Sequence, residues 1–198
     1  MIAVKFRMPD IERMTHKVGG AKDQLPFVMA GLLNDGAFKA RQVLVTQTWP
    51  RGVTVRNAAF MNAALTVDKA TKANLRVEIY DKLGRANLQL HAKGGIKTPR
   101  GRNLALPLPG SVTYGPRGIP LRQRPKGIIA RTPKRALRIT AGGIFVGEHG
   151  RLRLKYSFKP SAAIKADVPF YQDFEYVMRE SLRTGFADAM AKAMKTRR

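Results

Sequence analysis

"VPFYQDFEYVMRESLRTGFADAMAKAMKTRR", Val168–Arg198, is the longest periodic stretch of the chain. Its apolar residues recur three or four positions apart, which is typical of one face of a helix. They are Phe170, Phe174, Val177, Met178, Leu182, Phe186, Met190 and Met194. Asp173 and Glu175 lie in the first turns and cationic side chains close the segment, an order that complements the helix dipole. The stretch therefore predicts a long amphipathic helix that begins after Pro169.

The apolar face of such a helix must be buried, and the first ninety residues supply partners for it. The stretch "QLPFVMAGLLNDGAFKARQVLVTQTW" (24–49) has helical spacing and a proline in its first turn, while Asp10 followed by Ile11, Met14 and Val18 predicts a shorter helix before it. Alternating residues predict strands near 74–80, 137–146 and 151–158. We expect an α+β fold in one domain, 1–198. A small antiparallel sheet is packed by the N-terminal helix pair and by the long C-terminal helix.

Residues 92–135 have no sustained period, and they hold seven of the twelve prolines. Proline removes a backbone donor and disfavours helix at the preceding residue. This composition predicts an extended basic arm, rich in Gly and Pro, inserted in the domain. Leucines and isoleucines within the arm argue against pure disorder, so we expect it to become ordered against a neighbour.

Positive charge is concentrated around this arm. Between Asp81 and Glu148 lie 66 residues with fourteen Lys or Arg and no carboxylate, in a chain whose formal net charge is +24. A compact protein with this charge repels itself, so we expect a polyanion or an acidic protein surface beside it. The chain has no cysteine and no apolar run of about 18 residues, which excludes disulfides, thiolate metal sites and a membrane span. Its first residues lack the apolar core of a signal peptide, so we expect a soluble protein made in the cytoplasm.

Catalytic patterns are not evident in the sequence. His16, His91 and His149 occur at no metal-ligand spacing, and no phosphate-binding loop, dinucleotide fingerprint or nucleophile elbow is present. Glu78, Asp81 and Lys82 are compatible with a nuclease-like cluster, but solvated charges at a strand end explain them as well. We expect a protein that is not an enzyme and that has no catalytic, cofactor or metal site.

The arm itself is the candidate contact region. Its cations either track phosphates, with release of counterions, or lie between acidic protein subunits. Only Tyr114 lies among them, although binders of single strands interleave aromatic rings with charge, and apolar segments such as "NLALPLPG" suit the centre of a protein interface. We therefore expect protein contacts first and DNA second. The candidate contact residues are Lys93, Lys97, Arg100, Arg102, Leu104, Leu106, Leu108, Arg117, Arg122, Arg124, Lys126 and Arg131.

Three stretches resemble minor tail proteins of the Z type and tail-completion proteins of long-tailed bacteriophages. They are "TWPRGVTVRNAAFMNAAL" (Thr48–Leu65), "HAKGGIKTPRGRNLALP" (His91–Pro107) and Val168–Arg198, together about a third of the chain. The resemblance implies a structural virion protein of the tail or neck, present in several copies or a ring, that joins the tail to head-proximal components. It implies other tail or neck proteins as partners, possible contact with the genome end, and no membrane. The alternative from the residues themselves is a basic nucleic-acid-binding module, ribosome-associated or DNA-binding.

Overall fold

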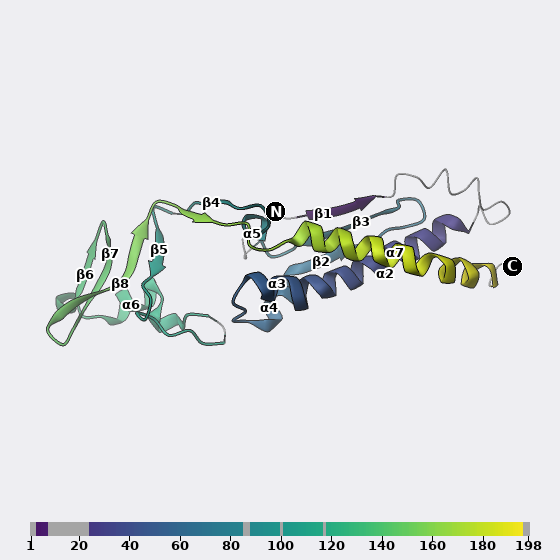
Figure 1. Cartoon of the computed structure of the whole chain (residues 1–198). Coiled ribbons are helices and arrows are strands. Elements are labelled where there is room, and N and C mark those ends of the chain that lie inside the picture. The colour runs from purple at the N-terminus through teal and green to yellow at the C-terminus, as the bar shows by residue number, and fades with distance from the viewer. Residues whose placement is uncertain (1–2, 8–23, 85–87, 100, 117, 196–198) are drawn as a thin grey trace. The chain divides into compact units, whose positions relative to one another are not determined.

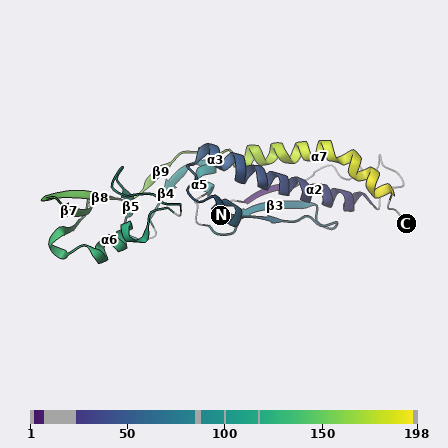
Figure 2. The ribbon, with the colours of Figure 1, turned by 90° about the horizontal axis from the view of Figure 1, so that it is seen from below.

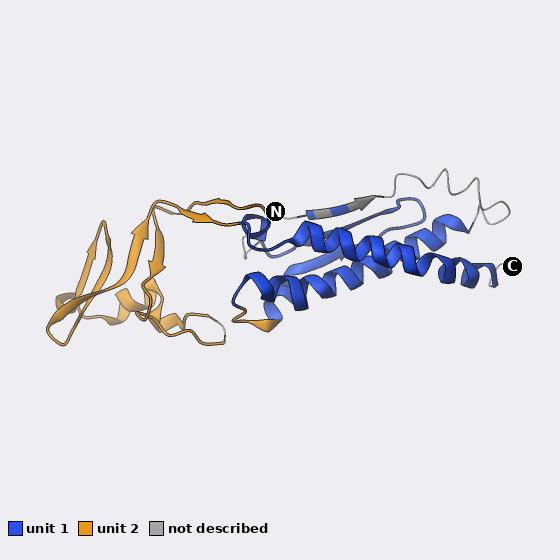
Figure 3. Ribbon diagram, viewed as in Figure 1, with its two compact units in different colours: residues 1–54, 59–92, 166–198 blue, residues 55–58, 93–165 orange. Residues whose placement is uncertain are grey.

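The computed structural model describes residues 3–7, 24–84, 88–99, 101–116 and 118–195. Its internal contacts group the chain into two compact units, whereas the sequence predicts one domain with an inserted arm (Figure 3). Unit 1 comprises residues 1–54, 59–92 and 166–198, and unit 2 comprises residues 55–58 and 93–165. The fold class is α+β, as predicted. The short helix predicted from Asp10 lies outside the described residues.

Unit 1 joins helices to a three-stranded sheet. Its elements are β1 (Ala3–Arg7), α2 (Leu25–Val43), the π-helical turn η2 (Leu44–Thr48), α3 (Trp49–Gly52), α4 (Ala58–Ala64), β2 (Leu65–Asp68), β3 (Arg76–Asp81), α5 (Leu88–Lys93) and α7 (Phe170–Lys195). The sheet is antiparallel, in the order β1-β3-β2. On β3, Val77 and Ile79 are buried while Arg76 is exposed, so the period-2 pattern read from the sequence is confirmed.

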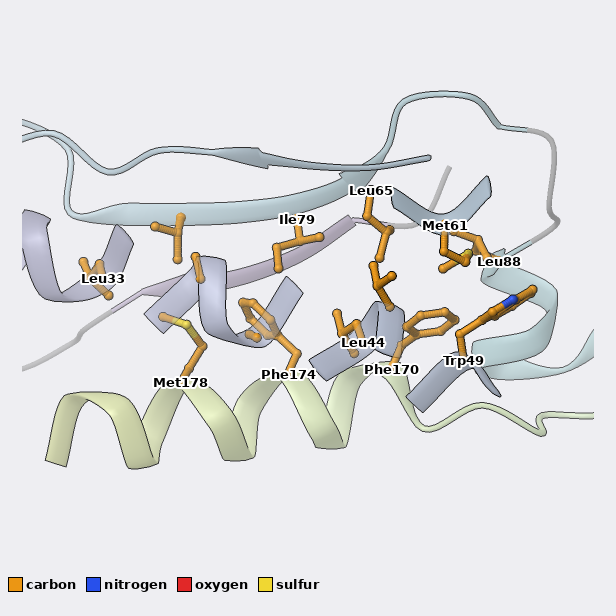
Figure 4. Packing of buried hydrophobic residues seen from close by; sticks show 14 of the residues in the cluster. Leu33, Leu44, Trp49, Met61, Leu65, Ile79, Leu88, Phe170, Phe174 and Met178 are labelled. Carbon is orange, nitrogen blue, oxygen red and sulfur yellow. The ribbon is translucent and has the colours of Figure 1, made fainter. Parts of the chain in front are cut away.

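The long helix α7 is confirmed, and it lies beside α2 in two perpendicular views (Figures 1 and 2). Figure 4 shows Phe170, Phe174 and Met178 of α7 directed towards the cluster that contains Leu44 and Ile79. Gly36 of α2 permits the close approach of the two helices, because a Cβ there would lie 3.2 Å from the Met178 sulfur. The apolar face of α7 is therefore buried against both α2 and the sheet.

Unit 2 is built mainly from strands. Its elements are β4 (Gly95–Lys97), β5 (Leu104–Pro107), the 3-10 turn η3 (Leu121–Gln123), α6 (Pro125–Arg131), the 3-10 turn η4 (Lys134–Ala136), β6 (Leu137–Thr140), β7 (Gly143–Glu148), β8 (Arg151–Lys159) and β9 (Ala162–Ile164). Four strands form an antiparallel sheet in the order β5-β8-β7-β6, and β4 pairs with β9. Among the described residues of unit 2, the large side chains that become buried are Ile144 and Tyr156.

Two expectations about the sheet and the arm are wrong. The strand at 76–81 does not join the strands at 137–146 and 151–159 in one sheet; β3 belongs to unit 1, and β6, β7 and β8 belong to unit 2. The segment 92–135 is more than an extended arm, because it contributes β4, β5 and α6. Its strands pair with β8 and β9, some fifty residues or more further along the chain, and a local period cannot reveal such partners.

A β-bulge changes the faces of β8. Ile144 pairs with Tyr156, but the next residue, Phe145, pairs with Leu154, so Lys155 is an extra residue in β8. A bulge of this kind reverses the alternation of side chains beyond it. Tyr156 therefore lies on the opposite face from Leu152 and Leu154, although strict alternation predicts all three on one face.

Candidate interaction surface

Charge is divided unevenly between the two units. Unit 2 contains 18 Lys or Arg and one carboxylate, Glu148, which gives a net charge of +17. Unit 1 contains 19 Lys or Arg and 12 Asp or Glu, which gives +7. Most of the excess charge of the chain therefore belongs to unit 2, which also contains all the candidate contact residues.

One face of the four-stranded sheet is covered around Tyr156 by the segment that contains η3 and α6. The hydroxyl of Tyr156, on β8, donates a hydrogen bond to the carbonyl oxygen of Gln123, at 2.9 Å. Ile144 lies opposite Tyr156 on β7 and is buried with it. Figure 2 shows α6 to one side of the strands. The pKa of Tyr156 is raised, chiefly because burial disfavours the phenolate.

The other face carries apolar side chains from three neighbouring strands. Leu104 and Leu106 of β5 lie on this face. They pair with Lys159 and Ser157 of β8, and these two residues are on the opposite side of the strand from Tyr156. Phe145 and Leu154 are directly paired on β7 and β8, on the same side. We call this surface the open sheet face and define it by Leu104, Leu106, Phe145, Leu152 and Leu154. Leu152 is 56% exposed and Leu106 is 38% exposed, so this apolar surface is accessible in unit 2.

Two cations lie on the open sheet face. Arg138 of β6 is directly opposite Phe145, and Lys159 of β8 is directly opposite Leu104. Both are exposed, and the described part of the chain gives neither an ion-pair partner. The face thus combines an apolar centre with positive charge at its margins.

The predicted contact residues fall into separate groups. Lys93 ends α5, Lys97 ends β4, and Arg102 precedes β5 in a bend. Leu104 and Leu106 lie on the open sheet face, and Leu108 follows β5 with its amide donating to the carbonyl oxygen of Lys155. The cations of η3 and α6 belong to the covering segment: Arg122, Arg124, Lys126 and Arg131. Arg100 and Arg117 lie outside the described residues.

The leucines of β5 and the arginines of η3 are therefore not on the same side of the sheet. From the sequence, Arg122 and Arg124 are expected to share one contact region with the arm leucines. Arg124 instead donates from Nε to the carbonyl oxygen of Ile119, at 2.9 Å, within its own segment. Near these residues a hollow of about 520 Å³ is lined by Pro116, Ile119, Pro120, Leu121 and Arg124, among others.

Sequence reasoning missed Phe145, Leu152, Leu154, Arg138 and Lys159 as surface residues. The alternation of Leu152 and Leu154 with arginines was a visible signal for a strand with one apolar face. The signal did not reveal that the face is open, since this depends on which side the segment before α6 covers. Nor did it reveal the bulge, which separates Tyr156 from the two leucines.

Glu148, the single carboxylate of unit 2, is held by two cations of β8. Its Oε1 lies 2.7 Å from Lys155 Nζ and its Oε2 lies 3.9 Å from Arg153 Nε. The hydrogen bond from Lys155 is the main reason why the pKa of Glu148 is below its ordinary value of 4.5, and the charges of Lys155, Arg153 and His149 act in the same direction. Burial acts in the opposite direction and is outweighed. These ion pairs stabilise the hairpin of β7 and β8.

We expect the contribution of Glu148 to depend on pH. A carboxyl group whose pKa is lowered by folding stabilises the folded state above its unfolded pKa, and this contribution is lost as the pH falls through the folded pKa. Glu148→Gln should therefore reduce the hydrogen-exchange protection of β7 and β8 at pH 7, and the difference from the parent should diminish as the pH falls below 4.5. Glu180→Gln, in unit 1, should leave β7 and β8 unchanged. Equal protection of Glu148→Gln and parent at pH 7 would contradict the proposed role of the ion pairs.

Three of the residues considered for catalysis, Glu78, Asp81 and His91, have structural partners. Asp81 is buried, and its Oδ1 accepts hydrogen bonds from the amides of Leu83 and Gly84, at 3.0 and 2.8 Å, which shapes the turn after β3. Glu78 pairs with Arg76 and Lys5. His91 Nδ1 lies 2.8 Å from an oxygen of Asp167, and His149 occupies a tight hairpin turn with positive φ. His16 lies outside the described residues.

Two other kinds of site are absent from the part of the chain that the structure describes. No group of three or more His, Asp or Glu side chains there is placed to hold a metal ion. No described helix combines the length and apolarity needed to cross a bilayer.

Comparison with known proteins adds no relative: no family model, no curated protein and no solved structure matches this chain.

Proposed function

We propose that this protein is a structural component of the tail or neck of a long-tailed bacteriophage, of the minor tail or tail-completion kind. In this role it acts in several copies and joins the tail to head-proximal components. It performs no catalysis and needs no cofactor. Its contacts with other tail or neck proteins are made mainly by unit 2, and contact with the genome end is secondary.

The observation that carries this proposal is the character of unit 2. The unit combines a net charge of +17 with an exposed apolar sheet face, while few of its described side chains are buried. Exposed apolar patches rimmed by polar residues mark interaction sites in soluble proteins. A subunit of a larger assembly has a reason to keep such a surface, because a neighbour covers it.

The resemblance in the three stretches supports the particular assembly. Two of them, Thr48–Leu65 and Val168–Arg198, contain α3, α4, the first residue of β2 and α7. The third, His91–Pro107, contains β4 and β5 at the start of unit 2. The resemblance therefore includes the helix that organises unit 1 and the first strand of the open sheet face.

A basic nucleic-acid-binding module is the second candidate, and the charge of unit 2 is the observation in its favour. Cations that neutralise phosphates release counterions and bind without sequence preference. Tyr114 is the aromatic residue among the arm cations, and its ring is covered by the guanidinium of Arg56, 3.4 Å from the ring centroid. A ring occupied in this way is not free to stack on a base, which favours the first candidate over a single-strand binder.

Two observations test the proposal. A tail-terminator or major tail gene next to the gene for this protein supports it, whereas a translation operon contradicts it.

Replacement of Leu104, Leu106 and Leu108 by Ser preserves the charge, so affinity for a DNA duplex and its salt dependence should stay within about twofold of the parent, while particle assembly should fail. The opposite pattern would favour the nucleic-acid module: normal particles with the leucine variant, and loss of DNA retention when Arg102, Arg122 and Arg124 are replaced.

A further inference from the structure

We infer that the open sheet face docks one kind of partner, a protein surface that carries carboxylates around an apolar centre. This inference deepens the proposed function by naming the chemistry of the partner and the residues that meet it. It rests on the geometry of β5, β6, β7 and β8, and on the distribution of charge in unit 2.

The open sheet face is large enough to hold the core of an interface. Strands in a sheet lie about 4.8 Å apart and rise about 3.3 Å per residue, so four strands of about five residues give a face on the order of 300 Å². A standard interface buries about 800 Å² on each partner, with an apolar core and a polar rim. Leu104, Leu106, Leu152, Leu154 and Phe145 therefore supply a core, and the residues around them supply a rim.

The rim has one sign of charge. Arg138 lies opposite Phe145 on β6, and Lys159 lies opposite Leu104 on β8, so each cation lies beside an apolar residue of the centre. Glu148, the one carboxylate of the unit, pairs with Lys155 and Arg153 instead. A partner that brings carboxylates satisfies both cations, and Arg binds carboxylates through two parallel hydrogen bonds.

The same features disfavour the other occupants. A second copy of the chain would bring two units of charge +17 together, with Arg138 and Lys159 on both sides of the contact. A nucleic acid would satisfy the cations, but its phosphates gain nothing from the apolar side chains of this face. An acidic protein surface is the one occupant that uses both parts of the face.

The experiment places the photo-crosslinking residue p-benzoylphenylalanine at position 152, in the full chain, within cells that naturally produce the protein. A matched sample carries it at position 121, where Leu121 is exposed on η3 and belongs to the covering segment. We expect position 152 to link to another protein, within a peptide that has Asp or Glu beside apolar residues, at least tenfold more than position 121 does. Links to a second copy of the chain or to nucleic acid would overturn the inference, as would equal yields at the two positions.

Charge variants give a second readout at position 152. Arg138→Glu with Lys159→Glu should reduce the yield of the link at least tenfold. Lys134→Glu with Arg151→Glu makes the same change in net charge at two exposed cations off the open sheet face, and it should reduce the yield less than twofold. Equal losses in the two double variants would show that only the total charge matters, and would overturn the inference. Circular dichroism of each variant checks that the fold is retained.

Failure of this inference is distinguishable from failure of the proposed function. If mass spectrometry finds the chain in purified virions but position 152 gives no link to an acidic surface, the inference alone fails. If position 152 links to an acidic protein that does not belong to a virion, the docking chemistry stands and the proposed function fails.

Discussion

Replacement of Phe174 by Asp should lower the free energy of unfolding of unit 1 by at least about 4 kcal/mol, a large part of the 5–15 kcal/mol that holds a typical domain together. Phe174 is 1% exposed and lies in the core cluster with Leu44, Val77 and Ile79. The substitution removes a buried ring and places a carboxylate where no partner is available, so both the lost burial and the unpaired charge act in the same direction. Urea denaturation followed by far-ultraviolet circular dichroism measures the change.

Two other positions on α7 complete this experiment. Tyr176→Asp is the matched control, because Tyr176 is exposed on the same helix, and surface substitutions usually change stability by less than about 0.5 kcal/mol. Val177 packs against the core cluster but is only partly buried, so Val177→Asp should cost less than Phe174→Asp. Unfolding of Phe174→Asp at the urea concentration of the parent would mean that α7 is not packed against this cluster.

Unit 1 was largely predictable from the sequence because its elements are local and strongly periodic. The helices at 25–43 and 170–195 and the strand at 76–81 each bury one face, and this leaves a period of 3.6 or 2 in the order of the residues. Pro26 in the first turn of α2 is also a local signal, because a proline there marks the start of a helix without reference to distant residues. What the period could not give is the pairing of β3 with β1 and β2, since partners across a sheet are set by tertiary contacts.

Unit 2 was predicted less well, because its strands pair with partners that are far away in the sequence. β5 contains Pro107 and only four residues, and it exists because β8 supplies the paired strand. The proline density of 92–135 predicts an extended arm, although Pro125 opens α6, a position where a missing amide donor costs nothing. Prolines at edge strands and helix starts are compatible with regular structure.

The candidate surface was predicted in part. The leucines of "NLALPLPG" were interpreted as the centre of an interface, and Leu104 and Leu106 do lie on the open sheet face. Their neighbours Phe145 and Leu154 come from a different part of the sequence, and only the register of β5, β8 and β7 brings them together. Proximity in sequence indicated Arg102, Arg122 and Arg124 as contact residues beside the leucines. The cations that share the open sheet face with the leucines are instead Arg138 and Lys159.

Replacement of Gly143 by Ala should disrupt unit 2 and leave unit 1 folded. Gly143 has φ of 152°, which side chains rarely adopt, and a Cβ there would collide with the carbonyl oxygen of Tyr156 and lie 2.8 Å from Leu154 Cδ1. The carbonyl oxygen of Tyr156 belongs to the backbone of β8, so the collision can be relieved only if β7 and β8 separate. Backbone strain of this kind costs about 1–3 kcal/mol before the collision is counted. In a unit with few buried side chains, we expect this to abolish the hydrogen-exchange protection of β7 and β8.

Gly142→Ala is the matched control, because it changes the adjacent residue in the same turn. A Cβ at Gly142 meets only the Thr140 hydroxyl oxygen, at 3.6 Å, which is an ordinary contact. Its β7 and β8 amides should keep the protection of the parent.

Trp49, the single tryptophan of the chain, is buried in unit 1, so its fluorescence reports the unfolding of that unit. Gly143→Ala should leave the Trp49 transition in urea unchanged, because no described residue of unit 2 belongs to the core clusters of unit 1. If the Trp49 transition moves together with the loss of protection in β7 and β8, the two units fold as one cooperative domain; if Gly143→Ala keeps full protection, the close contact of β7 with Tyr156 is not as the structure places it.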